Sequence, residues 1–575
     1  MDKSEIAAIF EEIAILLELQ GANPFRVRAY RNAARSLLNS DKSLKELIQE
    51  GKLTELAGIG DDLAEKITTL ALKKRLPFYE KLKKSTPKGI LKLIQIQGLG
   101  PKKVKALYEK LKIQTVEQLK KACAAGRIAR LKGFGARTEK NILDALAHRE
   151  TYQKRHLWWD AWERAEEILE ALKKVKGVKR AEIAGSLRRG LETIGDIDIL
   201  AASSNPKSVM DWFSRQDFVD KVLSKGPTKT SVKLEGGMQA DLRIVPEDEF
   251  GFALCYFTGS KEHNIKIRSL SLKKGWSLSE YGFEKAKGKG PSPVKKKAEE
   301  KDIYEVLGLS YIPPEMRENL GEVEAAEKRK LPTLIQLKDI RGTFHNHTTA
   351  SDGKNTLKEM ISAAERLGWE YIGISDHSKS SFQANGLSAE RLLAQTEEIQ
   401  KLERSKEFKI HIFSGSECDI LADGKLDFPD DVLEKLDFVI ASVHTSLSQD
   451  EKTITKRIIR AIEHPAVTML GHITGRLLLK REGTKVDVEK VIDACIANKK
   501  IIEINGNPYR MELDWRYLRA GVQKGLLTCI NTDAHSIHHH AFIRCGVNIA
   551  RKGWLEKKNA LNTRTLKEII KYFKK

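Results

Sequence analysis

Residues 185–200 read GSLRRGLETIGDIDIL, a stretch that sets two aspartates two positions apart in an otherwise apolar run. Successive side chains of a strand point to opposite faces, so Asp196 and Asp198 are expected on one face, with the isoleucines beside them in the core. A second strand is predicted over residues 238–245, with Asp241 on its polar face. Three carboxylates on adjacent strands repel one another unless cations lie between them, which predicts a site for two Mg²⁺ ions.

The chemistry that this cluster predicts is an in-line transfer at a phosphate. One ion would lower the pKa of a primer 3′-hydroxyl, and both would hold the reacting phosphate. Gly185, Ser186 and Arg189 precede the aspartates and offer a backbone amide, a hydroxyl and a guanidinium to a triphosphate. A D-x-D pair taken alone is more often two surface acids on an edge strand, so its neighbours decide between the two interpretations.

A short glycine turn recurs three times in the first 150 residues, each time followed by a helical run. The turns look like helix-hairpin-helix elements, in which glycines let backbone N–H groups approach a phosphate and a helix N-terminus lies behind them. One such turn is more often a plain connection, but three in a basic segment indicate DNA binding. The predicted DNA contacts are Gly58, Gly60, Gly98, Gly100, Lys102, Lys103, Gly133 and Gly135.

The charge balance narrows the class of partner. The 575 residues carry a formal net charge of +22, while charged residues of both signs make up 31%. Folded domains with basic faces fit this mixture, and nucleic acid is the first partner to expect. No apolar run approaches the length that spans a membrane, and the six cysteines include no C-x-x-C pair. We therefore expect a reduced, cytoplasmic, nucleoid-associated protein that works as a monomer.

Residues 340–575 contain a second set of candidate ligands. Short apolar strands alternate there with helical segments, which predicts a β/α layered or barrel fold whose strand ends meet at one mouth. A lone histidine is usually a packed or surface side chain, but nine candidates, most of them at strand ends, favour a site for Zn²⁺, Mn²⁺ or Fe²⁺. The nine are His345, His347, Asp352, His377, Glu417, His444, His472, Asp533 and His535.

The string G-S-x-R-R followed by G-D-x-D resembles the nucleotidyltransferase palm of family X DNA polymerases, and residues 256–260, YFTGS, match that family's turn at the incoming nucleotide. The resemblance implies a template-directed polymerase with two Mg²⁺ ions, which uses dNTPs to fill gapped or nicked DNA in base excision repair. Gln239 departs from the pattern, because animal polymerases often have an arginine there. The residues implied at the nucleotide are Tyr256, Phe257, Gly259, Asn264 and Arg268.

The N-terminal region resembles the small lyase domain of the same family through PFRVRAYR at residues 24–31. The resemblance implies that Arg26 and Tyr30 bind the 5′-phosphate and that Lys66 is the Schiff-base lysine. A Lys66 that only faces solvent or phosphate is an equally open alternative. Asp62 stands where the animal lyase motif has its second lysine, which puts lyase activity in doubt.

The histidine pattern resembles the PHP (polymerase and histidinol phosphatase) domain, a distorted (β/α)7 barrel that holds three metal ions. It implies up to three Mn²⁺ or Zn²⁺ ions and a 3′–5′ exonuclease, in some relatives also active at abasic sites. The alternative is a small-molecule phosphoesterase on a non-catalytic DNA-binding scaffold. The implied ligand sets are His345, His347, Glu417 and Asp533 for one ion, Glu417, His444 and His472 for the second, and Asp352, His377 and His535 for the third.

These predictions together describe a multidomain protein of α+β and α/β class. The expected parts are a lyase-like helical DNA-binding domain (1–85), a helix-hairpin-helix fingers-type domain (86–150), a palm with a mixed sheet (151–250), a thumb or nucleotide-selection subdomain (251–321), a linker (322–339) and a PHP metallo-phosphoesterase domain (340–575).

Overall fold

The computed structural model divides into two compact units, residues 1–154 and 155–575, and each is described by itself. The structure describes residues 1, 3–39, 44–56, 58–87, 89–94, 96, 99–131, 133–152, 155–287, 292–294 and 297–574. Within these residues no helix is both long enough and apolar enough to cross a membrane. All six cysteines have free thiols and are buried.

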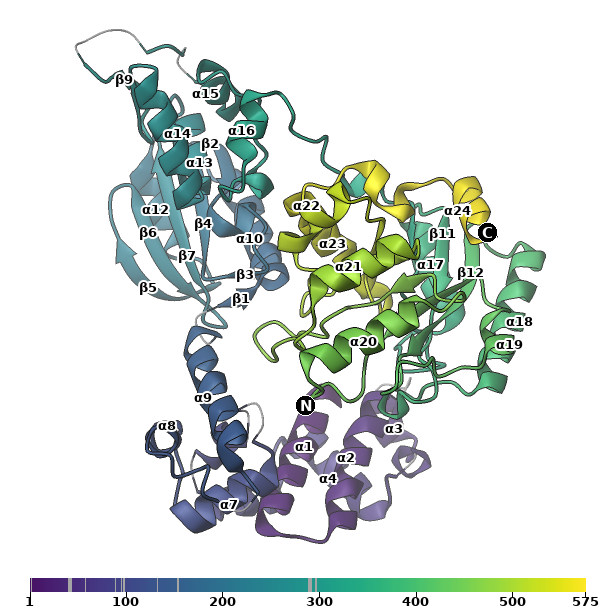
Figure 1. Ribbon diagram of the computed structural model, residues 1–575. Helices are drawn as coiled ribbons and strands as arrows, with labels where there is room; N and C mark the ends of the chain where they lie inside the picture. Colours follow the sequence, from purple (N-terminus) through teal and green to yellow (C-terminus); the bar gives the residue numbers. More distant parts are fainter. Residues whose placement is uncertain are drawn as a thin grey trace. The chain divides into compact units, whose positions relative to one another are not determined.

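The first unit is helical throughout its described part (Figure 1). Its elements are α1 (Lys3–Gln20), α2 (Pro24–Asn39), α3 (Leu44–Gln49), the 3-10 helix η1 (Leu53–Glu55), α4 (Asp61–Lys73), α5 (Pro77–Lys84), α6 (Ile90–Ile94), α7 (Pro101–Leu111), α8 (Val116–Ala124) and α9 (Gly135–Tyr152). Phe10, Tyr30, Ile67 and Leu107 are buried in its apolar core.

Each predicted glycine turn leads into a helix. Gly60 is the N-cap of α4, Gly100 is the N-cap of α7, and Gly135 is the first residue of α9. Gly58 and Gly133 have φ angles of 80° and 91°, in the left-handed region that favours glycine. The helix expected behind each turn is therefore confirmed.

The second unit begins with a five-stranded sheet of order β2-β4-β7-β6-β5. Its strands are β2 (Val178–Ile183), β4 (Asp196–Ser203), β5 (Val219–Lys225), β6 (Lys229–Leu234) and β7 (Gln239–Val245). β4 and β7 pair in parallel and the other neighbours are antiparallel, so the sheet is mixed as expected. The elements beside it are β1 (His156–Leu157), α10 (Trp158–Lys173), α11 (Gly185–Arg188), β3 (Thr193–Ile194) and α12 (Pro206–Phe213).

A smaller helical layer follows the sheet. Its elements are α13 (Phe250–Thr258), α14 (Lys261–Lys273), β8 (Trp276–Leu278), β9 (Phe283–Lys285), α15 (Glu300–Val306), the 3-10 helix η2 (Pro314–Met316) and α16 (Glu322–Glu327). Helix α16 begins where a linker is expected, yet Val323 and Ala326 are buried in the core of this layer. The fully buried Glu322 carboxylate lies 2.7 Å from His263 Nδ1, so the start of the expected linker belongs to the folded layer.

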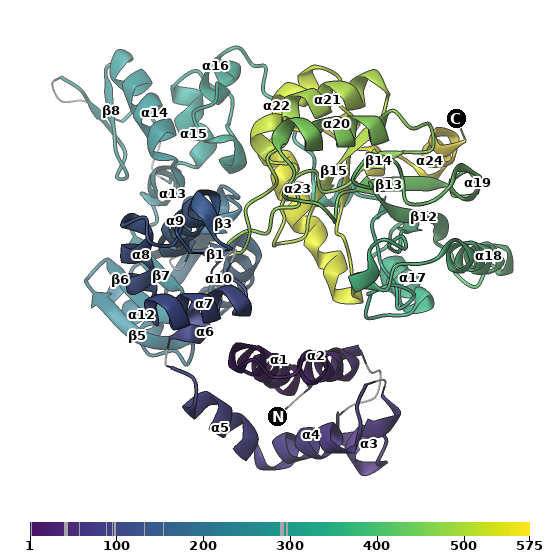
Figure 2. The same cartoon turned by 60° about the horizontal axis from the view of Figure 1, so that its bottom comes forward.

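The remaining residues form a nearly closed barrel of seven parallel strands in chain order, with its helices outside the strands (Figures 1 and 2). The strands are β10 (Gly342–Thr343), β11 (Tyr371–Ile374), β12 (His411–Asp419), β13 (Phe438–Ser442), β14 (Met469–Leu470), β15 (Ile501–Asn505) and β16 (Thr528–Asn531). The helices are α17 (Leu357–Arg366), α18 (Ala389–Ser405), α19 (Asp430–Leu433), α20 (Glu451–Ile462), α21 (Val488–Ala497), α22 (Trp515–Gln523), α23 (Ile543–Lys552) and α24 (Leu566–Phe573). The short 3-10 helices are η3 (Leu337–Asp339), which precedes the first strand, and η4 (Phe382–Ala384), η5 (Ile537–Phe542), η6 (Lys557–Asn559) and η7 (Leu561–Thr563), which lie between the helices.

The barrel has an apolar end and a polar end. Phe344, Phe413 and Phe438 pack together at the apolar end. A bridge between Asn346 and Ala534 joins the chain just beyond the first and last strands. The polar end lies where the strands finish, and this is the end that positions the candidate ligands.

Candidate functional site

The three palm aspartates meet on neighbouring strands. β4 and β7 run in parallel with Asp198 paired to Asp241, and Asp196 lies one pleat before Asp198. One oxygen of each of the three carboxylates lies within 4.8 Å of the others. Gly185, at a φ of 62°, lies against the Asp198 carboxylate so closely that a Cβ there would overlap it. The glycine of the G-S-x-R-R string is therefore needed for space as well as for backbone conformation.

The electrostatics of this cluster fit a divalent cation. Burial first, and then repulsion by Asp196 and Asp241, raise the pKa of Asp198 to about 7. Strand β6 contributes a cation, since Lys229 Nζ lies 2.6 Å from Asp241 Oδ2. Gln239 Nε2 donates to the other oxygen of Asp241 at 2.9 Å. Because a cation relieves carboxylate repulsion, the three aspartates fit the predicted magnesium site. Lys229 was not predicted from the sequence as a residue of this site, because it lies in no recognisable motif.

Arg189 joins two of the predicted nucleotide motifs. Its Nη1 donates to the Thr258 main-chain oxygen at 2.6 Å, and its Nε lies 3.0 Å from Glu318 Oε1. Neighbouring Arg188 instead pairs with Glu300 at 2.7 Å. The G-S-x-R-R string is thus tied to the YFTGS segment, and the Arg189 guanidinium already has protein partners. Ser186 lies within the short helix α11, which covers the first four residues of the G-S-x-R-R string.

The YFTGS segment joins two helices: α13 ends at Thr258, Gly259 is its C-cap with a φ of 69°, and Ser260 is the N-cap of α14. Asn264 Nδ2 donates to the main-chain oxygen of Tyr256 at 2.7 Å. Both residues and Arg268 line one small cavity. Phe257 faces away from it, with the Arg243 guanidinium 4.3 Å from its ring centre. The structure therefore brings three of the predicted nucleotide residues together and sets Phe257 against the sheet.

The predicted lyase residues gather around Phe78 in the first unit. The Arg26 guanidinium lies 5.2 Å and the Lys66 ammonium 5.7 Å from its ring centre, and the ring of Tyr30 stacks on it at 6.1 Å. Lys66 is ion-paired with the carboxylate of Asp62 one helical turn earlier. The residue that departs from the animal lyase motif, Asp62, is therefore in direct contact with the predicted Schiff-base lysine.

The predicted basic contacts follow a glycine turn. Lys102 and Lys103 lie in the first turn of α7, directly behind Gly100. A phosphate at that turn would meet both the helix N-terminus and two ammonium groups. Gly98, predicted for the same turn, lies outside the described residues.

Five histidines surround the carboxylate of Glu417 at the polar end of the barrel. Glu417 lies within β12, while the histidines follow the ends of four other strands. The distances from Glu417 Oε2 are 3.2 Å to His345 Nε2, 3.6 Å to His347 Nε2 and 3.0 Å to His377 Nδ1, and those from Oε1 are 3.2 Å to His444 Nε2 and 2.9 Å to His472 Nε2. Each oxygen faces its own set of imidazoles, so Glu417 could contribute one oxygen to each of two groups of ligands.

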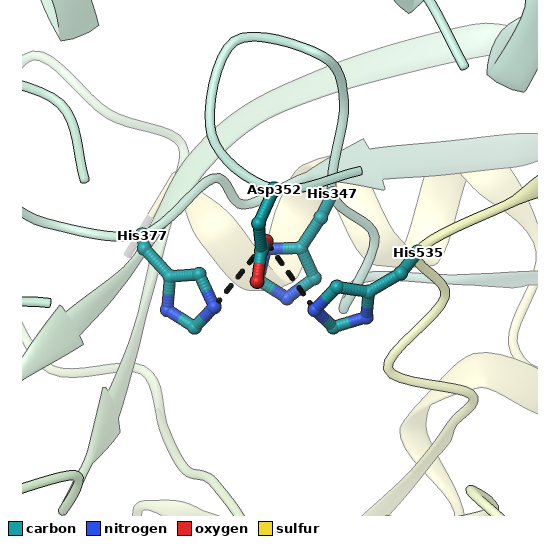
Figure 3. Close-up of side chains that lie close together, drawn as sticks. All are labelled: His347, Asp352, His377 and His535. Atoms are coloured by element: carbon teal, nitrogen blue, oxygen red, sulfur yellow. Dashed lines mark ion pairs between the residues drawn. The ribbon is translucent and has the colours of Figure 1, made fainter. Parts of the chain in front are cut away.

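A second carboxylate, that of Asp352, lies close to three histidines of the cluster. Asp352 Oδ1 lies 3.3 Å from His535 Nε2 and 3.6 Å from His377 Nε2, with His347 Nδ1 at 4.0 Å (Figure 3). Asp533 Oδ1 lies 3.3 Å from His347 Nε2. All nine predicted ligands therefore converge. Their grouping differs from the implied sets, since His347 and His377 each belong to two groups of candidate ligands.

The cluster leaves buried ligand atoms that a metal would satisfy. Among the described residues, both oxygens of Glu417, both ring nitrogens of His347 and Nε2 of His345 and His444 are buried without a hydrogen-bond partner. Unpaired buried polar atoms are costly, and imidazole with carboxylate is a donor set for Zn²⁺, Mn²⁺ or Fe²⁺. Although burial lowers the pKa of His535, Asp352 and Asp533 raise it to about 9. The carboxylates of the cluster thus strongly favour a positively charged ligand.

Three residues of this end were missed in the sequence. Glu503 Oε1 lies 2.6 Å from His345 Nδ1, and Asp419 Oδ1 lies 2.5 Å from His444 Nδ1. Such partners fix the orientation of a ligating imidazole. Arg510 Nε lies 3.2 Å from Asp533 Oδ2. Glu503 is an acid inside an apolar strand, which is a signal that could have been noticed.

Comparisons with known proteins cover the whole chain. A protein of Bacillus subtilis named DNA polymerase/3′-5′ exonuclease PolX is 38% identical over 577 residues, which is 100% of both chains. Rat DNA polymerase lambda is 26% identical over 54% of this chain and 55% of its own. A probable phosphatase of Caldicellulosiruptor bescii is 30% identical over 33% of this chain and 78% of its own. The family models that match are a helix-hairpin-helix domain (1–76), a SAM-like helix-hairpin-helix tandem (90–148), the DNA polymerase beta thumb (253–318) and the PHP domain (343–507).

Proposed function

The chain belongs to the PolX family, family X DNA polymerases that carry a PHP domain, and from this membership we propose that it both extends and trims DNA strands. The observation that carries the proposal is that one chain holds two separate and complete clusters of candidate metal ligands. The B. subtilis relative, aligned over its full length, bears the name of both activities.

We propose that the palm fills short gaps in DNA repair. Asp196, Asp198 and Asp241 would hold two Mg²⁺ ions, which when bound would lower the pKa of the primer 3′-hydroxyl and neutralise charge at the α-phosphate. The chain's own contribution is positioning. Gln239 and Lys229 each hold one oxygen of Asp241, so its carboxylate is oriented before substrate arrives. Nucleotide selection is proposed for Tyr256, Phe257, Gly259, Asn264 and Arg268, together with Gly185, Ser186 and Arg189.

We propose that the barrel is a 3′–5′ exonuclease. Its nine converging ligands would hold up to three Mn²⁺ or Zn²⁺ ions, which when bound would acidify water and neutralise a phosphoester. Glu503 and Asp419 support the imidazoles of His345 and His444. Action at abasic sites is proposed only as a second use of the same centre.

The proposed substrates are gapped or nicked DNA with a primer 3′-hydroxyl and a 5′-phosphate, and dNTPs. The net charge of +22 and the three glycine turns support a DNA partner. We propose a monomer, because both clusters are complete within one chain. The six-part division of the chain remains a proposal, with the start of the linker moved beyond helix α16, and is supported by the family matches and by the break between residues 154 and 155.

A second candidate for the barrel is a phosphatase that acts on small esters, favoured by its similarity to the C. bescii protein. Under this alternative the barrel would hydrolyse a small phosphomonoester with Mn²⁺ and leave DNA ends intact.

One assay tests both proposals. A 5′-labelled primer on a gapped template is incubated with dNTPs and Mg²⁺, and then without dNTPs and with Mn²⁺. We expect extension in the first case and shortening in the second. Asp198→Asn should abolish extension and keep shortening, while His345→Ala should do the reverse. Loss of both activities in either variant would contradict two independent sites.

A further inference from the structure

Two loops at the polar end of the barrel carry basic and aromatic side chains that the ligand cluster does not use. Residues 471–487 follow β14 and residues 506–514 follow β15. The loops are bound to each other, because Arg476 Nε donates to the main-chain oxygen of Arg510 at 2.7 Å and the Leu478 amide donates to that of Tyr509 at 2.6 Å. The two loops therefore form one connected rim beside the cluster.

Apart from the ligand His472, Arg510 reaches the cluster from this rim. The two oxygens of the Asp533 carboxylate have different partners. Oδ1 lies 3.3 Å from His347 Nε2, while Oδ2 lies 3.2 Å from Arg510 Nε. The guanidinium thus pairs directly with Asp533, one of the candidate metal ligands. Its Nη1 is buried and has no hydrogen-bond partner among the described residues.

An unpaired N–H of a buried guanidinium is costly unless a ligand completes it. A ligand that lies between the candidate metal site and a guanidinium is expected to be anionic, and the planar arginine fork matches the oxygens of a phosphate. The chemistry of the position therefore indicates a phosphate oxygen as the missing partner.

Tyr509 lies next to Arg510 and points outward. It is 39% exposed, and Lys480 of the other loop holds its ammonium 3.7 Å from the ring centre. An exposed aromatic ring beside a lysine suits a nucleobase that stacks on the ring and a backbone phosphate that meets the ammonium. A small phosphomonoester would use neither group.

We propose that Arg510 binds the scissile phosphate and that Tyr509, with Lys480, binds the terminal nucleoside, so that the barrel accepts the 3′ end of a single strand. The proposal rests on the nuclease function proposed above and names its substrate contacts. Tyr509 gives affinity for any base, because every base has an aromatic face.

The phosphate contact is tested with Arg510→Gln. We expect inhibition of trimming by thymidine 5′-monophosphate to weaken about 100-fold, as for loss of a charge-assisted contact. The bound Mn²⁺ content after dialysis should remain that of the unmodified protein. If the metal content falls and inhibition by the nucleotide is unchanged, Arg510 only orients Asp533 and the proposal is wrong.

The stacking contact is tested without turnover. The probe is a single-stranded oligonucleotide with 2-aminopurine at its 3′ end and a terminal phosphorothioate that slows hydrolysis. We expect the protein with Mn²⁺ to change the fluorescence of the base, Tyr509→Phe to retain the change and Tyr509→Ala to lose it. Tyr517→Ala is the matched control, because Tyr517 is 37% exposed on α22.

The outcomes distinguish failure of the proposed nuclease function from failure of the proposed substrate contacts. If the unmodified protein trims no DNA with Mn²⁺, the nuclease function itself is wrong. If it trims DNA and Tyr509→Ala behaves like Tyr517→Ala, the nuclease stands and the substrate contacts proposed here are wrong.

Discussion

Lys552, in helix α23 of the barrel, donates a hydrogen bond to the main-chain oxygen of Arg189 in the palm at 3.1 Å. Its ammonium also lies 2.6 Å from Glu318 Oε1, the carboxylate oxygen that accepts from Arg189 Nε. The Lys552 side chain is fully buried. One lysine of the barrel is therefore part of the packing around a proposed nucleotide-binding arginine.

Removing this ammonium should destabilise the second unit. Lys552→Met removes the fully buried partner of the half-buried Glu318 and the donor to the Arg189 carbonyl oxygen, and breaking a buried pair costs about 3 kcal/mol. We expect this loss in the free energy of unfolding measured with urea, and a raised KM for dNTPs. Lys558→Met is the control, since the Lys558 side chain is 75% exposed. Equal stability of the two variants would contradict a structural role for Lys552.

Two glycines of the palm motif make a matched pair. A Cβ at Gly185 would overlap the Asp198 carboxylate, whereas a Cβ at Gly195 would meet nothing within 4 Å. We expect Gly185→Ala to slow primer extension about 100-fold or more, because a misplaced metal ligand costs at least that much. Gly195→Ala should extend primers within about threefold of the unmodified rate, a small change for a site without contacts. A Gly185→Ala protein with normal extension would mean that Asp198 can move without loss.

The palm should require more Mg²⁺ in acid. With a pKa of about 7, Asp198 carries a proton below pH 7 in the metal-free protein, and that proton must leave before an ion binds. The apparent Mg²⁺ affinity should therefore fall about tenfold for each pH unit below 7 and level off above it. Mg²⁺ titrations of single-turnover extension from pH 5.5 to 8.5 measure this. The same Mg²⁺ requirement at pH 6 and pH 8 would exclude Asp198 as the titrating group.

Glu503 should control metal affinity in the barrel without touching the metal. Glu503→Gln loses the charge beside His345 Nδ1, and loss of such a partner weakens metal binding about 10- to 100-fold. We expect a lower Mn²⁺ content after dialysis, restored trimming at high Mn²⁺ and unchanged primer extension. Glu489→Gln, at an exposed position of α21, is the control. If Glu503→Gln retains its metal and still loses trimming, Glu503 acts on the substrate instead.

Local periodicity made much of both sites predictable. The D-x-D spacing placed Asp196 and Asp198 on one strand face, and β4 with β7 has that arrangement. The barrel ligands could be predicted because strand ends of parallel strands meet at one end. The first prediction needed only the spacing of residues within one strand, and the second needed the repeated position of ligands at the ends of several strands.

The remaining features depend on partners far apart in the sequence. Lys229 reaches Asp241 from another strand, and Arg510 reaches Asp533 from the loop after β15. Neither lies in a motif, so only packing brings them to the cluster.

The sequence by itself determined which side chains would share a face and which chemistry they could support, because backbone geometry repeats every two residues in a strand. Only the tertiary structure decided that His347 and His377 serve two groups each, and that Lys552 lies under Arg189. Those relationships follow from how the apolar surfaces of separate elements pack, and packing is not encoded in any short stretch of the chain.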